Sequence, residues 1–326
     1  MTAMPSLREA CLRHCVHYKS VLRRAGRLYR AGGASLNNGL AMFDAEWGNI
    51  KTGQAWAEAN LRNDEAAVAC CNDYPAAGAY LLPLRQHPRE RIRWVKAALV
   101  AAKSLGSVSA ECAHLGSLGT AYFDLGETQR AVEFYEQQLA LARRLENPSS
   151  EGRAMNNLAL AYVRLSEIPR AMELYERRLA IARQLGDRRG EANVLSNLGS
   201  AYALTGEPDR AIELHEKALA LHRENGDRLG EGRALGNLGH AYSKKGQNRS
   251  ALECFERRLV IAREIRDRRG EAIALSNAGL LLKNLGEEAK ALAYSEASLK
   301  IREEIEERNA ANIRRRLAEW SQGKVT

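Results

Sequence analysis

Asparagine side chains recur every 40 residues through the second half of this 326-residue chain. Asn157, Asn197, Asn237 and Asn277 occupy the same place in four successive segments. A primary amide both donates and accepts hydrogen bonds, so a ladder of amides can hold the backbone of an extended peptide whatever its side chains. Each amide could instead bond a neighbouring helix or face solvent. The uniform spacing favours peptide contact, and we predict a peptide-binding column.

Cationic side chains share the helix face of these asparagines. Guanidinium and ammonium groups along a binding surface favour acidic side chains or a C-terminal carboxylate. An ordinary solvated run of charges is the alternative. Ser200 and His240 lie on the same face and complete the predicted peptide-binding set. The cationic members of the set are Arg153, Arg164, Arg233 and Lys244.

Cysteine and histidine also gather near the start of the chain, at Cys11, His14, Cys15 and His17. A structural zinc site usually draws its ligands in pairs from separate elements, whereas these residues fall on one helix within an apolar stripe. We therefore predict no metal site and no cofactor. The 6 cysteines show no framework spacing, which is typical of buried thiols in a reducing cytoplasm.

Four further histidines, all within the repeats, do not indicate catalysis. They are expected at equivalent or solvent-facing positions of a repeated frame, and none stands at the spacing of a nucleophile, base and orienting group. Near-identical segments present a surface rather than one unique catalytic cluster, so the sequence predicts a protein that is not an enzyme. These histidines are His114, His215, His222 and His240.

These side chains must be positioned by short helices that follow a repeated sequence pattern, called the frame. Five consecutive 40-residue blocks align without insertion or deletion. Such a unit cannot bury its apolar face alone, so stacked neighbours must share a core. The predicted fold is an all-α, right-handed α-solenoid of antiparallel helix pairs. The blocks are 111–150, 151–190, 191–230, 231–270 and 271–310.

One block shows how each pair of helices is built. In 191–230 the first helix, called helix A, is expected to follow an N-cap at Asp187 and to end at Gly206. Helix B follows from Pro208, and Gly199 is the small residue at the contact between the two. At 100° per residue, positions 193, 197, 200 and 204 lie within about 60° of one another, away from the apolar stripe. Stacking would align these polar faces as one concave surface.

The residues of this frame resemble the tetratricopeptide repeat family. The pattern reads Leu198-Gly199, Tyr202 and Ala211, and it recurs in the blocks before and after. The last block has lost the tyrosine of the pattern and has Ser295 where others have an aromatic residue, which suits a terminal capping unit. The resemblance implies a protein-binding scaffold whose helix A residues contact a peptide.

The sequence predicts three regions: an N-terminal helical region over 1–106, five repeat units over 107–306, and a C-terminal capping helix and tail over 307–326. Residues 64–106 are expected to form a degenerate unit, with helix B at 88–106 and its partner disturbed by two prolines. Before it, the aromatic segments 43–50 and 54–57 are expected to form a helical pair.

This N-terminal region is similar to the segment that introduces the repeats in bacterial signalling ATPases of the NB-ARC/STAND group. In that group the repeats sense a ligand and an upstream nucleotide-binding module switches. No G-x-x-x-x-G-K-[ST] phosphate loop occurs in this sequence. The resemblance therefore implies a sensor arm without its ATPase, and a separate ATPase or effector in bacterial signalling or defence as a possible partner.

The distribution of charge leaves one further function as an alternative, which is nucleic-acid binding. The net charge is +9, and residues 1–32 are strongly basic, so helix 8–31 could grip nucleic acid. It lacks interleaved aromatic residues for base stacking. Docking of an acidic protein partner or packing on the solenoid is favoured, and no membrane association is expected because no apolar run approaches the ~20 residues of a membrane span. The sequence predicts no particular oligomeric state.

Overall fold

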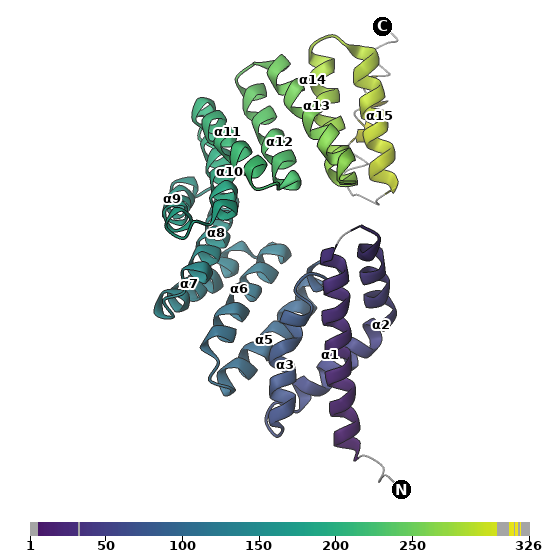
Figure 1. Cartoon of the computed structure of the whole chain (residues 1–326), viewed down its shortest axis with the longest axis vertical. Coiled ribbons are helices and arrows are strands. Elements are labelled where there is room, and N and C mark those ends of the chain that lie inside the picture. The colour runs from purple at the N-terminus through teal and green to yellow at the C-terminus, as the bar shows by residue number, and fades with distance from the viewer. Residues whose placement is uncertain (1–5, 32, 305–312, 316, 319, 321–326) are drawn as a thin grey trace. The chain divides into compact units, whose positions relative to one another are not determined.

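The computed structural model describes residues 6–31, 33–304, 313–315, 317, 318 and 320, and every regular element within them is a helix (Figure 1). The chain divides into two compact units, residues 1–167 and 168–326. Each unit stacks antiparallel helix pairs, so the predicted all-α solenoid fold is confirmed. The first unit contains α1 (Leu7–Ala31), α2 (Gly33–Ala59), α3 (Glu65–Ala77), α4 (Leu82–Arg85), α5 (Pro88–Ser104), α6 (Val108–Leu125), α7 (Thr128–Arg144) and α8 (Pro148–Arg164). The second contains α9 (Ile168–Gln184), α10 (Arg188–Leu204), α11 (Pro208–Glu224), α12 (Arg228–Lys244), α13 (Asn248–Glu264), α14 (Arg268–Asn284) and α15 (Glu288–Glu304).

Local capping sets the boundaries of the helices. Asp187 caps α10 by accepting a hydrogen bond from the backbone N of Gly190 at 2.8 Å, as the sequence predicts. Gly186, just before it, has φ +63, a left-handed conformation that only glycine adopts at little cost. Asp227 and Asp267 repeat the same cap on α12 and α14. The helix pairs therefore end where the repeated residues place them.

Glycine on helix A makes the space for a large residue of helix B. A Cβ at Gly199 would lie 2.8 Å from Cε1 of His215, and a Cβ at Gly239 would lie 2.7 Å from the ring of Phe255. In these pairs the two helices can approach closely because this side chain is missing, and the pair α8–α9 has the small Ala159 at the same position. The small residue predicted at the contact is therefore confirmed at Gly199.

A chain of ion pairs joins successive helix pairs in the second unit. Glu231 accepts hydrogen bonds from Arg223 at 2.8 Å and from Arg228 at 2.5 Å, and Arg228 also pairs with Glu264 of α13. Burial alone would raise the pKa of Glu231, yet the bonds from the two arginines leave that pKa lowered. The same arrangement surrounds Glu191 and Glu271. Many of the interleaved charges therefore link one repeat to the next.

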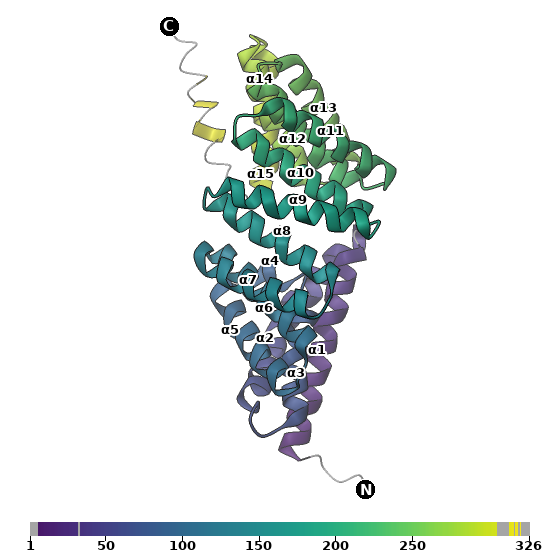
Figure 2. The ribbon, with the colours of Figure 1, turned by 90° about the vertical axis from the view of Figure 1, so that its left-hand side faces the viewer.

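The first unit begins with two long helices instead of three shorter ones. The sequence predicts a helical pair in the aromatic segments of 43–57, but α2 runs through both without a break, so this prediction is wrong. Gly48 and Gly53 do not interrupt it, because helix packing outweighs the low helix propensity of two glycines. Figure 2 shows α1 as the long purple helix along one edge of this unit. Its core gathers Phe43, Tyr74 and Trp94, all almost fully buried.

The expected degenerate unit corresponds to α3, α4 and α5. Pro75 stands in the last turn of α3, which ends at Ala77, and Pro83 stands in the short α4. At the other end of the chain, the described residues of the expected capping helix (313–315, 317, 318 and 320) are helical, and the others lie outside the described residues.

Candidate functional site

The four asparagines of the predicted column are half-buried on helices α8, α10, α12 and α14. In the second unit, Nδ2 of Asn277 lies 3.2 Å from Nε2 of His240 on the preceding helix A, and Asn197 also has a partner. Asn157 and Asn237 make no side-chain hydrogen bond within the described part of the chain. Two of the four amides are therefore open to a ligand, and the other two already bond within the protein.

Two of the predicted cationic residues hold successive A helices together. Arg164 donates to the backbone carbonyl of Phe123 at 2.6 Å, and its guanidinium lies 3.8 Å from the centre of the Phe123 ring. Lys244, two repeats later in the frame, donates in the same way to the carbonyl of Ala203 at 2.8 Å. The last carbonyls of a helix have no partner within the helix, so these bonds satisfy them. This packing role accounts for the basic residue at this position.

The other predicted residues are more open. Arg233 is exposed and has no ion pair or hydrogen bond among the described residues. His240 is exposed and packs edge-on against Phe255. Ser200 bonds the carbonyl of Ser196 in its own helix at 3.0 Å. Arg153 is exposed and donates to Ser150 one turn earlier.

A cavity of about 470 Å³ lies on the helix A side of the first unit. It brings together two predicted site residues, Arg153 and Asn157 of α8, with side chains from five other helices. Its walls are mainly apolar on one side, where α3 and α4 end. The lining residues are Pro75, Ala76, Ala79, Tyr80, Leu82, Pro83, Arg91, Val95, Ala113, His114, Gly116, Ser117, Thr120, Gln138, Arg153 and Asn157.

Buried polar groups lie at the base of this cavity. Gln138 is 4% exposed, and its Oε1 has no hydrogen-bond partner. Its amide packs on the backbone of Gly116, where any Cβ would clash with it. Arg91 is 5% exposed and pairs with Asp124. A buried polar atom without a partner is costly in free energy, and a ligand donor that reached it would recover that loss.

Histidine in the first unit borders the same cavity. His114 is buried, with Nε2 3.0 Å from Oδ1 of Asn72, and burial lowers its pKa. His215 and His222 in the second unit are buried as well. Solvent-facing positions are therefore excluded for these three. His215 stands at the equivalent frame position of Tyr135, Tyr175 and Phe255, where a helix B side chain packs under helix A.

The basic N-terminal helix divides into paired and unpaired cations. Arg8 pairs with Asp64 at 2.7 Å and Lys19 with Asp73 at 2.9 Å. Four further arginines are exposed and make no ion pair within the described residues; they are Arg13, Arg23, Arg24 and Arg27. Cys15, on the opposite side of the helix, is fully buried. No group of three or more potential metal ligands occurs in the described ranges, and no helix there is long and apolar enough to cross a bilayer.

Stacked antiparallel helix pairs on one 40-residue frame define a helical-hairpin repeat protein. The profile of the tetratricopeptide repeat matches residues 109–184, 190–264 and 272–305, and the chain belongs to this family. Sequence reasoning found the family, the helix A residues stay a predicted site, and Arg91 and Gln138 of the cavity were not among them. The sequence signal for Gln138 was the glycine at position 116, on which its amide packs. The equivalent positions of the other blocks hold Asn156, Ser196, Gly236 and Ser276.

Solved structures share the fold at low identity. BtubC (BKLC) from P. vanneervenii is 21% identical, with a TM-score of 0.60 over 67% of this chain and 92% of that one. A STAND protein with a tetratricopeptide repeat sensor from Pyrococcus horikoshii is 16% identical, with a TM-score of 0.59 over 99% of this chain but 54% of that one. Aspartyl phosphate phosphatase F from Bacillus subtilis is 12% identical, with a TM-score of 0.61 over 99% and 96%. No curated protein sequence matches the chain.

Proposed function

We propose that this protein is a non-enzymatic scaffold that binds an extended acidic peptide along its helix A faces. Tetratricopeptide repeats generally mediate binding of protein partners, and the repeats here cover more than half of the chain. The observation that carries the proposal is the cavity of the first unit, which combines an apolar wall with Arg153, Asn157 and an unpaired buried amide oxygen at Gln138. In this proposal one apolar residue of the peptide fills the cavity.

Each side chain has a role that its surroundings support. Asn157 would bond the peptide backbone, because its amide has no partner within the described residues. Arg153 is exposed at the cavity mouth and would pair with an acidic residue next to the buried one. In the second unit, Asn237 and Arg233 offer the same combination of an open amide and an unpaired cation.

Selection from a random peptide library on the whole protein tests the proposal. We expect enrichment of peptides with acidic residues beside an apolar one. Arg153→Ala with Asn157→Ala, and separately Arg233→Ala with Asn237→Ala, should each weaken the selected peptide at least tenfold by calorimetry while the melting temperature stays unchanged. Arg189→Ala, which removes an exposed arginine outside both sites, is the control. Selected peptides without acidic residues, or equal affinity for all variants, would contradict the proposal.

A second proposal is that the chain acts as a separate sensor arm for an ATPase or effector encoded elsewhere. The fold likeness to the STAND protein with a repeat sensor supports it. We expect the product of an adjacent gene for an ATPase, protease or nuclease to change its activity when this protein is added. An unchanged activity at saturating concentration would oppose this role.

A further inference from the structure

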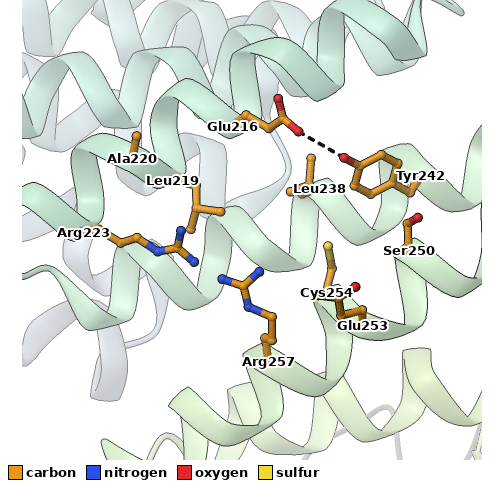
Figure 3. A pocket seen from close by; sticks show the side chains of 10 residues that line it. All are labelled: Glu216, Leu219, Ala220, Arg223, Leu238, Tyr242, Ser250, Glu253, Cys254 and Arg257. Carbon is orange, nitrogen blue, oxygen red and sulfur yellow. Dashed lines mark hydrogen bonds between the residues drawn. The ribbon is translucent and has the colours of Figure 1, made fainter.

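A second cavity, of about 360 Å³, opens in the second unit among α11, α12 and α13 (Figure 3). Helix B side chains form most of it, so it shares no residue with the predicted helix A site. Leu219, Leu238 and Cys254 are buried in its lining, and charged side chains stand around them. The full lining is Glu216, Leu219, Ala220, Arg223, Leu238, Tyr242, Ser250, Glu253, Cys254 and Arg257.

This cavity exists because two residues are smaller than their counterparts in the preceding repeat. Cys254 stands where the preceding helix B has Leu214, and Ser250 stands where it has Arg210. Arg210 lies over the ring of Tyr202, 5.3 Å from its centre. Replacing an arginine by serine and a leucine by cysteine removes the side-chain volume that would otherwise occupy this place. The opening is therefore specific to this junction and is not a property of every repeat.

Two guanidinium groups point toward one another across the cavity, Arg223 from α11 and Arg257 from α13 (Figure 3). Nε of Arg223 is bonded to Glu231. Arg257 makes no ion pair or hydrogen bond with any described residue. At the same position of the preceding repeat, Lys217 pairs with Glu213 at 2.5 Å. Arg223 is paired with Glu231, whereas the guanidinium of Arg257 keeps its hydrogen-bond donors free, so a carboxylate that entered between the two could bond both.

The other charges in the lining restrict which anion fits. Glu216, an acid on the cavity wall, accepts a hydrogen bond from the hydroxyl of Tyr242 at 3.1 Å. Glu253 is a second acid in the lining. A dianionic phosphate would be repelled by both, whereas a single carboxylate can take bidentate hydrogen bonds from a guanidinium. The buried leucines and Cys254 accommodate a short aliphatic segment behind that carboxylate.

We infer that this cavity is an interaction site for an acidic side chain of a protein partner. The carboxylate lies between Arg223 and Arg257, and its methylene groups lie against Leu219, Leu238 and Cys254. The site is independent of the proposed helix A site, because the two use different helices and different residues. A partner that reached both would contact the protein on its helix A and its helix B sides.

Arginine side-chain NMR on the whole protein tests this inference with a minimal probe. We expect N-acetyl-glutamate α-amide to produce a saturable shift of the Arg257 Nε–Hε signal, and the neutral isostere N-acetyl-glutamine α-amide to produce none. Inorganic phosphate is the third probe. A shift with phosphate but not with the glutamate probe would overturn the choice of a carboxylate, and no saturable shift with either would overturn the site.

Variants separate the cavity from general surface charge. Cys254→Leu restores the residue of the preceding repeats, so it should close the cavity and weaken the glutamate probe at least tenfold without lowering the melting temperature. Arg257→Gln should do the same by removing the charge, with binding followed at the Nε–Hε signal of Arg223, and it is the deciding variant if Cys254→Leu fails to fold. Arg249→Gln, on the same helix but outside the lining, is the matched control. Unchanged binding in Arg257→Gln, or equal loss in Arg249→Gln, would overturn the proposal; loss only in Arg153→Ala with Asn157→Ala would instead place the probe at the helix A site.

Discussion

A buried histidine makes the stability of the second unit depend on pH. His215 of α11 is 1% exposed, packs under Gly199 of α10, and its Nδ1 has no hydrogen-bond partner. Burial lowers its pKa to about 4, and the charge of His240 on α12 acts in the same direction. Protonation of this ring therefore opposes folding.

The sign and size of the effect follow from the two pKa values. The unfolded chain has the ordinary value of 6.5, so between pH 6.5 and 4 it binds more protons at this site than the folded chain. The contribution of the neutral His215 ring to the free energy of unfolding is fully present above pH 6.5 and is lost as the pH falls from 6.5 to 4. At about 1.4 kcal/mol for each pKa unit, the loss is about 2 kcal/mol at pH 5 and about 3 kcal/mol below pH 4.

His215→Phe tests this reasoning, because Phe255 fills the same place in the next repeat. Urea unfolding followed by circular dichroism, at pH 7.5 and pH 5, should show that the variant gains about 2 kcal/mol relative to the natural protein on going to pH 5. His17→Gln, at an exposed site of α1, controls for the loss of a histidine. If the difference between His215→Phe and the natural protein were the same at both pH values, the argument from burial would be refuted.

Two further changes probe the packing of the repeats. Glu231→Gln should lower the free energy of unfolding by about 2 kcal/mol at pH 7, because the buried carboxylate holds Arg223 and Arg228; a loss below about 0.5 kcal/mol in urea unfolding would show that the ion pairs contribute little. Gly119→Ala should cost at least about 2 kcal/mol, since its Cβ would clash with the ring of Tyr135, whereas Gly48→Ala, with nothing within 4 Å, should stabilise by about 0.5 to 1 kcal/mol. Equal melting temperatures for these two alanine variants would contradict the assigned contacts.

The sequence predicted the helix pairs well, because their determinants are local and repeated. The cap at Asp187 and the stop at Gly186 act within a few residues. The cap recurs at Asp227 and Asp267 and the glycine at Gly226, while Arg266 takes the same left-handed φ one repeat later. The single helix α2 was not predicted, because its continuity depends on packing against α1 and α3 rather than on its own propensity.

The sites were less predictable, because they depend on which side chains meet between helices. The contact of Gln138 with Gly116 joins residues 22 apart in different helices, and the unpaired Oε1 emerges only from that packing. The cavity beside Cys254 arises because smaller side chains leave space unfilled. A search for recurring residue spacings does not detect such a change in side-chain volume. His215 could have been assigned as buried by aligning it with Tyr175 and Phe255.

The chain of ion pairs between repeats has a consequence for how such an array can change in length. Arg183 of α9 and Glu191 of α10 are 8 residues apart, as are Arg223 of α11 and Glu231 of α12, and each link uses the same residue types at both ends. Inserting one residue between such partners would misplace the pair, but inserting a whole 40-residue unit would supply a fresh arginine and a fresh glutamate in register. Gain or loss of a complete unit therefore preserves the ion pairs between repeats, whereas a shorter insertion breaks them. A longer array is expected to arise by duplication of whole units rather than by short insertions.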